Sequence, residues 1–335
     1  MRPALLILAA VTCVAEDADT AEVTAVVETA DVAGDPDDPA IFVSPLGPAA
    51  SRVLATDKER GLTVFDLAGQ RVQQLDAGRL NNVDLRPGFE LADGRTGALA
   101  LASRRSDNSV VAFFVDDAGT VAELPVADGA TGLTVYGMCM GRFDGATYVY
   151  VNDKDGRVGQ WEVRAEGPGV ALTMRRTVAV DSQPEGCVVD DVHRRLYVGE
   201  EKVGIWRFDA GPDAVTDKIA VDVTGADGRL IADVEGLAIY DAGDGEGWLL
   251  ASSQGDSAFA VYERTGDNAF VGRFRVVAGS IDAVGETDGI EVTSAPLGPD
   301  FPQGMFVAMD DRNEGFGTGF KYVDWRAIEA VLAVP

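Results

Sequence analysis

Histidine is nearly absent from this chain, since His193 is the single one among 335 residues. A zinc site built from several histidines is therefore excluded, and a Ser-His-Asp hydrolase would have one candidate base. The sequence also lacks a GxSxG elbow, a Walker A loop and a dinucleotide-binding glycine motif in a βαβ context. The chemistry that remains is that of oxygen ligands and of lysine and arginine side chains.

Basic residues are scarce, with 28 Lys and Arg against 55 Asp and Glu, which gives a formal net charge of −27. This balance argues against nucleic acid and anionic membranes as partners, because both attract positively charged surfaces. The excess of carboxylates has two interpretations: a solubilising surface, or binding of divalent cations. Composition alone leaves both open.

Long apolar runs are also missing, and the longest candidate lies at the N-terminus. Residues 1–15 combine the basic Arg2, an apolar stretch and a plausible cleavage site after Ala15, which predicts an export signal. The stretch is too short for a permanent membrane anchor. A lipoprotein with Cys13 as the lipidated residue is the alternative, although Thr12 fits that motif poorly. We expect a secreted or periplasmic protein.

Cysteine is limited to three residues, of which Cys139 and Cys187 follow the predicted signal. An exported chain can oxidise such a pair, and both residues lie on predicted strands at similar depth. Two buried free thiols are an equally open interpretation. No CxxC motif or Cys/His metal spacing is present.

What the sequence does contain is a repeat of about fifty residues. Each copy is a short apolar strand preceded by an acidic or tyrosyl residue, and successive copies are separated by 46, 52, 49, 50 and 53 residues. The six expected entrance residues are Asp38, Asp84, Tyr136, Glu185, Glu235 and Asp288. A repeat of this size with many glycines predicts an all-β fold, a six-bladed β-propeller formed as a single domain by residues 16–335. One short helix is expected at 323–332.

A second repeat lies 16 to 22 residues after the first, where a return strand ends in a polar turn. Its members are Lys58, Arg105, Lys154, Glu201, Gln254 and Asp310. Because successive strands of a blade alternate in direction, the turn after the second strand should lie beside the start of the first. Both repeats should therefore meet at one end of the propeller.

Carboxylates gathered at one end would repel one another unless cations or protons relieve the repulsion. Carboxylate oxygens are hard ligands that suit Ca²⁺, and no EF-hand loop is present, so the ligands must come from separate blades. The candidates are Asp37, Asp38, Asp84, Glu185, Glu200, Glu201, Asp233, Glu235, Asp288 and Asp310.

Three basic residues occupy matching turns of successive blades: Lys58, Arg105 and Lys154. Together they predict an anionic substrate, since Arg binds phosphate through two nitrogens and Lys acts as a point charge. For each residue taken singly, a salt bridge to a neighbouring carboxylate is the alternative.

Eight segments together resemble the β-propeller phytases, a family of calcium-dependent phytate hydrolases. They are 37–43 (DDPAIFV), 80–86, 182–186, 196–208, 232–240, 251–255, 286–292 and 305–310, within a resemblance that spans about residues 28–330. The resemblance implies a six-bladed propeller with several Ca²⁺ ions and hydrolysis of phytate by attack of water, without a covalent enzyme intermediate.

The resemblance also implies roles for individual residues. Those matching catalytic calcium ligands are Asp37, Glu185, Glu201, Asp233, Glu235 and Asp288. Those matching positions that hold ions or shape their sites are Asp38, Gln254 and Asp310. Those matching phosphate contacts are Lys58, Arg105, Tyr136 and Lys154.

Two other functions stay open at this point. A calcium-dependent propeller hydrolase of another class, such as a lactonase, would explain the carboxylates but not the three bases. A non-catalytic binding propeller is the second alternative, because a fold does not fix a function. For all three functions we expect a monomer, since a propeller leaves only short, protected sheet edges. For the phytase we expect phytate or another inositol phosphate as the small-molecule substrate.

Overall fold

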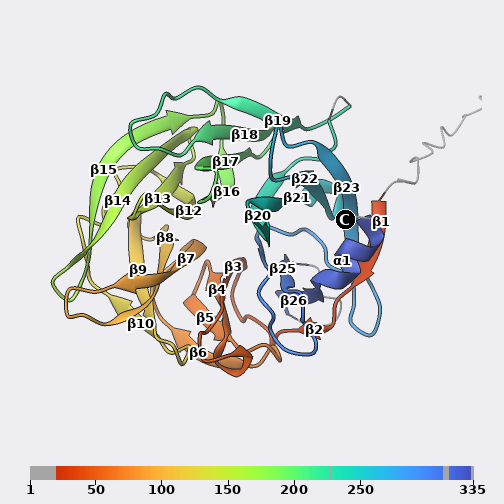
Figure 1. Ribbon diagram of the computed structural model, residues 1–335, viewed down its shortest axis with the longest axis horizontal. Coiled ribbons are helices and arrows are strands. Elements are labelled where there is room, and N and C mark those ends of the chain that lie inside the picture. Colours follow the sequence, from red (N-terminus) through yellow and green to blue (C-terminus); the bar gives the residue numbers. More distant parts are fainter. Residues whose placement is uncertain (1–19, 227, 312–316, 333–335) are drawn as a thin grey trace, which may run out of the picture.

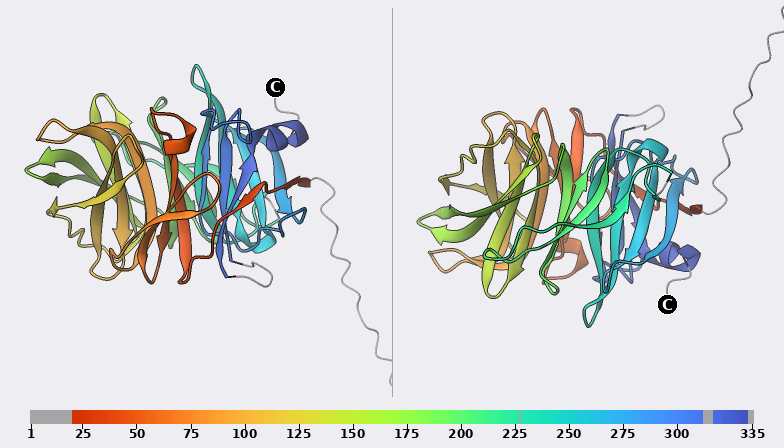
Figure 2. Two further views of the ribbon diagram at one scale, coloured as in Figure 1. Left: turned by 90° about the horizontal axis from the view of Figure 1, so that it is seen from below. Right: turned by 90° about the horizontal axis from the view of Figure 1, so that it is seen from above.

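The computed structural model describes residues 20–226, 228–311 and 317–332, and these residues form six sheets arranged radially around a common axis (Figure 1). Viewed from the side, the molecule is a disc whose strands run across its thickness (Figure 2). The predicted all-β, six-bladed propeller is confirmed. The predicted export signal, residues 1–15, lies outside the described residues.

Blades one to four follow the chain order from the axis outwards. Blade one is β3 (Pro36–Phe42), β4 (Arg52–Asp57), β5 (Gly61–Phe65) and β6 (Arg71–Leu75). Blade two is β7 (Leu80–Glu90), β8 (Thr96–Arg104), β9 (Ser109–Val115) and β10 (Val121–Leu124). Blade three is β12 (Val135–Phe143), β13 (Ala146–Asp153), β14 (Arg157–Glu166) and β15 (Gly169–Ala179), with β11 (Val126–Ala127) at its outer edge. Blade four is β16 (Pro184–Asp190), β17 (Arg195–Glu200), β18 (Gly204–Asp209) and β19 (Ile219–Val223).

The N-terminal strands complete the last two blades and so close the ring. Blade five is β20 (Val234–Gly243), β21 (Glu246–Ser253), β22 (Ala258–Glu263) and β23 (Phe270–Val277), to which β1 (Thr20–Thr24) adds in parallel. Blade six is β24 (Ile290–Thr293), β25 (Met305–Asp310) and β26 (Gly319–Asp324), and β2 (Val27–Glu28) is its outermost strand. The N-terminal strands β1 and β2 are thereby hydrogen-bonded to the C-terminal blades.

The hydrophobic core is divided into six clusters, each of which lies between two neighbouring blades. Between blades one and two, for example, Leu54 packs with Leu85 and Phe113. Between blades five and six, Phe259 and Phe306 meet edge to face with their ring centroids 5.0 Å apart. The strands therefore bury both faces, which explains their nearly continuous apolar runs.

The expected terminal helix is α1 (Trp325–Leu332), two residues shorter than predicted. It lies beside β1 and β23 (Figure 1), and Trp325 stacks on Tyr240 with a centroid distance of 3.8 Å. In the part of the chain that the structure describes, no helix has the length and apolar content needed to cross a bilayer.

In blades one to five, a β-bulge near the start of the first strand places two residues of that strand opposite one residue of the second strand. In blade one, Pro36 pairs with Asp57 and Pro39 pairs with Ala55. The two residues between them on β3, 37 and 38, therefore lie opposite a single residue of β4. The same shift occurs in β7, β12, β16 and β20. A bulge redirects the side chains it carries, and here it directs them toward the end of the axis where the first strands begin, which we call the entrance face.

The second residue of the bulge is glycine in blades three, four and five. At Gly186 a Cβ atom would lie 1.8 Å from the carbonyl oxygen of Glu235 in the next blade, and at Gly137 equally close to that of Glu185. Glycine is required because the bulges of neighbouring blades touch through their backbones.

We predict that Gly186→Ala lowers the free energy of unfolding by about 3 kcal/mol, because the methyl group forces two backbones apart. Gly211→Ala is the matched control, since its new Cβ would meet nothing closer than the Asp209 Oδ1 atom at 3.1 Å. Urea unfolding of both variants measures the difference. Equal stabilities would contradict the backbone contact as the cause.

Candidate metal and phosphate site

The first residue of each bulge points toward the entrance face. These residues are Asp37, Asn81, Tyr136, Glu185 and Glu235, and in blade six Asp288 lies two residues before the start of β24. In five blades, the turn after the second strand donates its backbone N–H to the carbonyl two residues before the bulge residue. The N–O distance is 2.7 Å from Lys58 to Asp35 and 2.8 Å from Arg105 to Arg79. The two repeats therefore meet at the entrance face, as predicted.

The predicted register of the first repeat is wrong in blades one and two. The entrance residues are Asp37 and Asn81, whereas Asp38 is the second bulge residue and Asp84 lies three residues deeper along β7. Neither bulge carries the acid-glycine pair found in blades four and five, so the residue pattern alone does not identify the entrance residue. The Asp38 carboxylate accepts the Val83 N–H at 3.1 Å.

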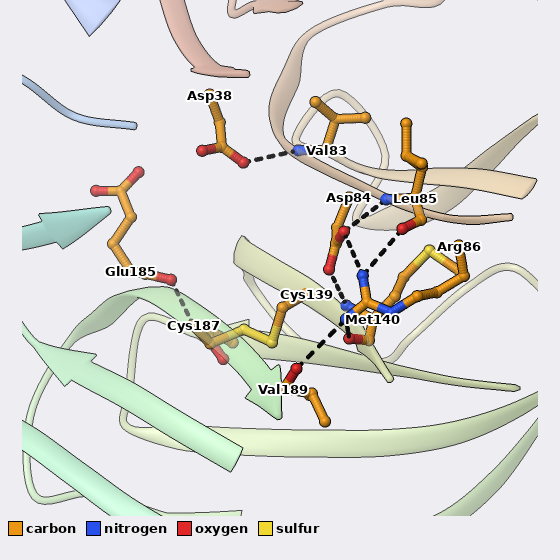
Figure 3. The surroundings of a disulfide bond; sticks show 11 residues. Asp38, Val83, Asp84, Leu85, Arg86, Cys139, Met140, Glu185, Cys187 and Val189 are labelled. Carbon is orange, nitrogen blue, oxygen red and sulfur yellow. Dashed lines mark hydrogen bonds and ion pairs between the residues drawn. A yellow bond between two sulfur atoms is a disulfide. The ribbon is translucent and has the colours of Figure 1, made fainter. Parts of the chain in front are cut away.

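Asp84 instead lies further along the innermost strand of blade two, away from the entrance face. It accepts hydrogen bonds from Arg86 and from the Met140 N–H at 2.8 and 2.7 Å (Figure 3). Burial raises its pKa, although Arg86 opposes the change. A metal-binding role for Asp38 and Asp84 remains a prediction that these contacts do not support.

The second repeat is displaced by one residue in blade six, where the turn position is Asp311 and not Asp310. Asp310 is the last residue of β25, and its carboxylate pairs with the buried Lys321 ammonium at 2.7 Å. Glu200 is likewise the last residue of β17 and accepts hydrogen bonds from Ser182 and Trp206, both at 2.6 Å. Because side chains alternate along a strand, these two carboxylates lie within their blades, and we leave them out of the proposed site.

Three glutamates from two neighbouring blades form the centre of the site. Oxygen atoms of Glu185, Glu201 and Glu235 lie within 4.8 Å of one another, and each residue is less than 10% exposed. Gln183 donates a hydrogen bond of 2.6 Å to Glu201, and Asn81 donates one of 2.6 Å to Glu185. Asp233, which is half-buried, adds its negative charge to that of Glu201.

Burial and mutual repulsion raise the pKa of two glutamates of this cluster, Glu201 and Glu235. Burial raises the pKa of Glu235 well above its usual range, and the negative charge of Glu185 raises it further. The pKa of Glu201 is raised by burial as well, and Glu185 adds to that shift. The pKa of Asp37 is raised by burial, against the attraction of Lys58.

The residues present fit a divalent cation. Asp37 Oδ1 and Glu235 Oε2 are buried oxygen atoms without a hydrogen-bond donor, an arrangement that native proteins rarely leave unexplained. All candidate ligands are hard oxygens contributed by several blades, and a cation between them would satisfy the oxygens and remove the repulsion.

Lys58 supplies positive charge on one side of the cluster. Its Nζ atom lies 2.7 Å from both Asp37 Oδ2 and Asp288 Oδ2, and Gln254 donates a hydrogen bond of 2.6 Å to the other oxygen of Asp288. Burial alone would lower the pKa of Lys58, but the two aspartates raise it, so the side chain is charged. Asp288 also lines a cavity of about 330 Å³ together with Gln254 and Asp311.

Two further cations lie over the ring of Tyr136. The Lys154 ammonium is 4.0 Å and the Arg105 guanidinium 5.5 Å from the ring centroid, both within the range of cation–π attraction. Burial lowers the pKa of Lys154, and the charge of Arg105 lowers it further. The Tyr136 hydroxyl bonds to Glu185, so the aromatic ring connects the cations to the carboxylates.

Three residues at this site were missed by sequence reasoning: Asn81, Gln183 and Asp311. Asn81 accepts a hydrogen bond of 3.1 Å from Arg105 while it donates to Glu185. A signal was present, because all three occupy the same repeat positions as predicted residues or stand two positions before one. Asn81 and Gln183 are neutral amides and carry no charge that would mark them, whereas Asp311 follows another aspartate, Asp310, to which the turn position was assigned.

Comparison with known proteins gives one family. The sequence profile of the phytase family matches residues 2–333. The 3-phytase of Bacillus subtilis (strain 168) is 38% identical over 324 residues, which cover 92% of this chain and 84% of that protein.

Among solved structures, the PQQ-bound aldose sugar dehydrogenase from Streptomyces coelicolor has a TM-score of 0.52 at 15% identity, covering 90% of this chain and 97% of that one. The hydrazine synthase of Kuenenia stuttgartiensis has a TM-score of 0.52 at 10% identity, covering 85% of this chain and 83% of that one. At such low identity the likeness concerns the fold alone.

The protonation of Asp288 predicts a pH effect on stability in chelator. Burial raises the pKa of Asp288 from 3.8 to about 6, so the folded state binds more protons than the unfolded state between these values. Stability contributed by this group is therefore present at low pH and is lost as pH rises, by about 3 kcal/mol. Urea unfolding of the wild type and Asp288→Asn between about pH 4 and 7 isolates the effect. A difference between the two proteins that stays constant with pH would contradict it.

Proposed function

The chain belongs to the phytase family, and on that premise we propose that it is a calcium-dependent phosphomonoesterase that hydrolyses phytate to lower inositol phosphates and phosphate. The observation that carries the calcium part is the buried group of Glu185, Glu201 and Glu235, with unpartnered oxygens beside three basic side chains. A lactonase-like activity would leave the three bases without a role. A non-catalytic binding propeller could use them to hold an anionic ligand, and it is distinguished by the absence of phosphate release.

The proposed calcium ligands are the carboxylates of the entrance face: Asp37, Glu185, Glu201, Asp233, Glu235 and Asp288. When bound, calcium would supply positive charge for phosphate oxygens and acidify a water molecule for attack at phosphorus. The protein's own part is to hold these carboxylates, which come from four blades, at fixed positions. No large rearrangement is then needed at the moment of reaction.

The basic residues would hold the phosphate groups of the substrate. Arg105 presents a planar guanidinium, fixed by Asn81 and by the Tyr136 ring, and Lys154 lies over the same ring. Lys58 pairs with two of the carboxylates, Asp37 and Asp288. Phytate carries several phosphates, so one could lie at the carboxylate cluster while a neighbour contacts Arg105 and Lys154.

We further propose that the protein is exported as a monomer and acts outside the cytoplasm. The disulfide between Cys139 and Cys187 supports this proposal, because such bonds persist in oxidising compartments. Cleavage after residue 15 is the proposed route, and lipidation at Cys13 is the alternative; mass spectrometry of the mature N-terminus distinguishes them.

The proposed function is tested by phosphate release from phytate in calcium and in chelator. Release should require calcium, and Glu201→Gln should reduce it by about 100-fold, because one carboxylate ligand is replaced by a neutral amide. The neighbouring Glu200→Gln is the matched control. It changes a carboxylate bonded to Ser182 and Trp206 and should lower stability while leaving calcium-dependent turnover close to wild type. Turnover that is indifferent to calcium would refute the metal role.

A second adjacent pair tests substrate binding. Arg105→Ala should raise KM for phytate about tenfold or more with little change in melting temperature, since it removes a cation that lies at the entrance face. Arg104→Ala removes a guanidinium paired with Asp107 at 2.8 Å and should leave KM unchanged. If Arg105→Ala instead lowered the melting temperature and left KM unaltered, the residue would be a structural ion-pair member.

A further inference from the structure

Cys139 and Cys187 form a disulfide between the innermost strands of blades three and four, with their Cα atoms 5.6 Å apart (Figure 3). Cys139 follows Tyr136 by three residues on β12, and Cys187 follows Glu185 by two residues on β16. The bond therefore joins the two strands that present a candidate phosphate contact and a candidate metal ligand.

Non-covalent contacts between the same strands lie on both sides of the disulfide. Toward the entrance face, the Gly137 backbone touches the Glu185 carbonyl, which also accepts a hydrogen bond of 2.5 Å from the Asn152 side chain. Toward the opposite face, the Arg86 guanidinium donates to the carbonyls of Met140 and Val189 at 2.5 and 3.5 Å. The sulfur atoms are buried between these two layers.

We propose that the Cys139–Cys187 disulfide is a positioning element of the metal site, which holds Glu185 and Tyr136 at the spacing that calcium binding requires. The proposal rests on the function proposed above. The site needs such a tie because Glu185 faces the negative charges of Glu201 and Glu235 and would be pushed away from them.

The non-covalent contacts near Glu185 resist this repulsion weakly, because Gly137 brings no side chain to pack against Glu185 and the Asn152 hydrogen bond holds only the Glu185 carbonyl. The junction of blades four and five has a different tie, in which the Val234 N–H donates to the Glu201 carbonyl at 2.8 Å. Fixing ligands before the ion arrives raises affinity because less ordering is required on binding.

The test is the double variant Cys139→Ala/Cys187→Ala, studied by calorimetric titration with calcium alone and by phytate turnover. We expect the dissociation constant for calcium and the half-saturating calcium concentration to rise about tenfold, as for loss of an outer support of a metal ligand. Turnover at saturating calcium should stay near the wild-type rate. Phe274→Leu, in the hydrophobic core at β23 of blade five, is the control for general destabilisation.

Reduction of the wild type is the second arm. Dithiothreitol transfers two electrons and two protons to the disulfide, giving two cysteine thiols and the cyclic oxidised reagent. A count of two free thiols marks completion. Reduced wild type should then bind calcium as weakly as the double variant, and the reagent should not alter the variant.

The inference is overturned if the double variant and the reduced protein melt at lower temperature but bind calcium like the wild type. It is also overturned if Phe274→Leu, at an equal loss of melting temperature, weakens calcium binding equally. The outcome is separate from that of the proposed function. Disulfide-dependent calcium binding without phosphate release would refute the phytase function alone, whereas calcium-dependent release with equal binding would refute the positioning role alone.

Discussion

Repulsion between buried carboxylates is the constraint on which the entrance face depends. Glu185, Glu201 and Glu235 approach one another within 4.8 Å while almost excluded from water. In that environment each charge is costly unless it is paired, protonated or bound to a cation. Other groups of the site offset this repulsion. Lys58 pairs with Asp37, the Tyr136 hydroxyl bonds to Glu185, and unpartnered oxygens are available to a cation.

The propeller provides the rigidity that such a cluster requires. Six hydrophobic clusters, one at each junction, hold the blades at fixed angles, and N-terminal strands close the ring. The bulges of blades one to five each bring one side chain to the entrance face, and glycines let the backbones of Glu185 and Glu235 come close to their neighbours. Separation of carboxylates that belong to different blades is opposed by these contacts, and the disulfide adds a covalent tie between blades three and four.

Much of this arrangement could be predicted from sequence because the repeat has a fixed period. Spacing near fifty residues determined the number of blades, and alternation of strand direction placed Lys58, Arg105 and Lys154 beside the entrance residues. The errors were of one to three residues, at Asp38, Asp84 and Asp310. The errors at Asp38 and Asp84 arose because a bulge inserts residues without changing composition, so the strand pairing, which the sequence does not display, decides which residue faces the axis. The error at Asp310 arose because β25 includes this residue, so the turn position is Asp311.

Residue types at a regular period were enough to predict the class of fold, the family resemblance and the chemical character of the site. The folded arrangement was needed to show which oxygens converge. It brought Glu185 and Glu235 together from positions fifty residues apart, directed Glu200 and Glu201 to opposite sides of one strand end, and joined two cysteines whose pairing the sequence left open. The physical reason is that periodicity fixes what each blade contributes, whereas distances across the axis depend on how blades pack against one another.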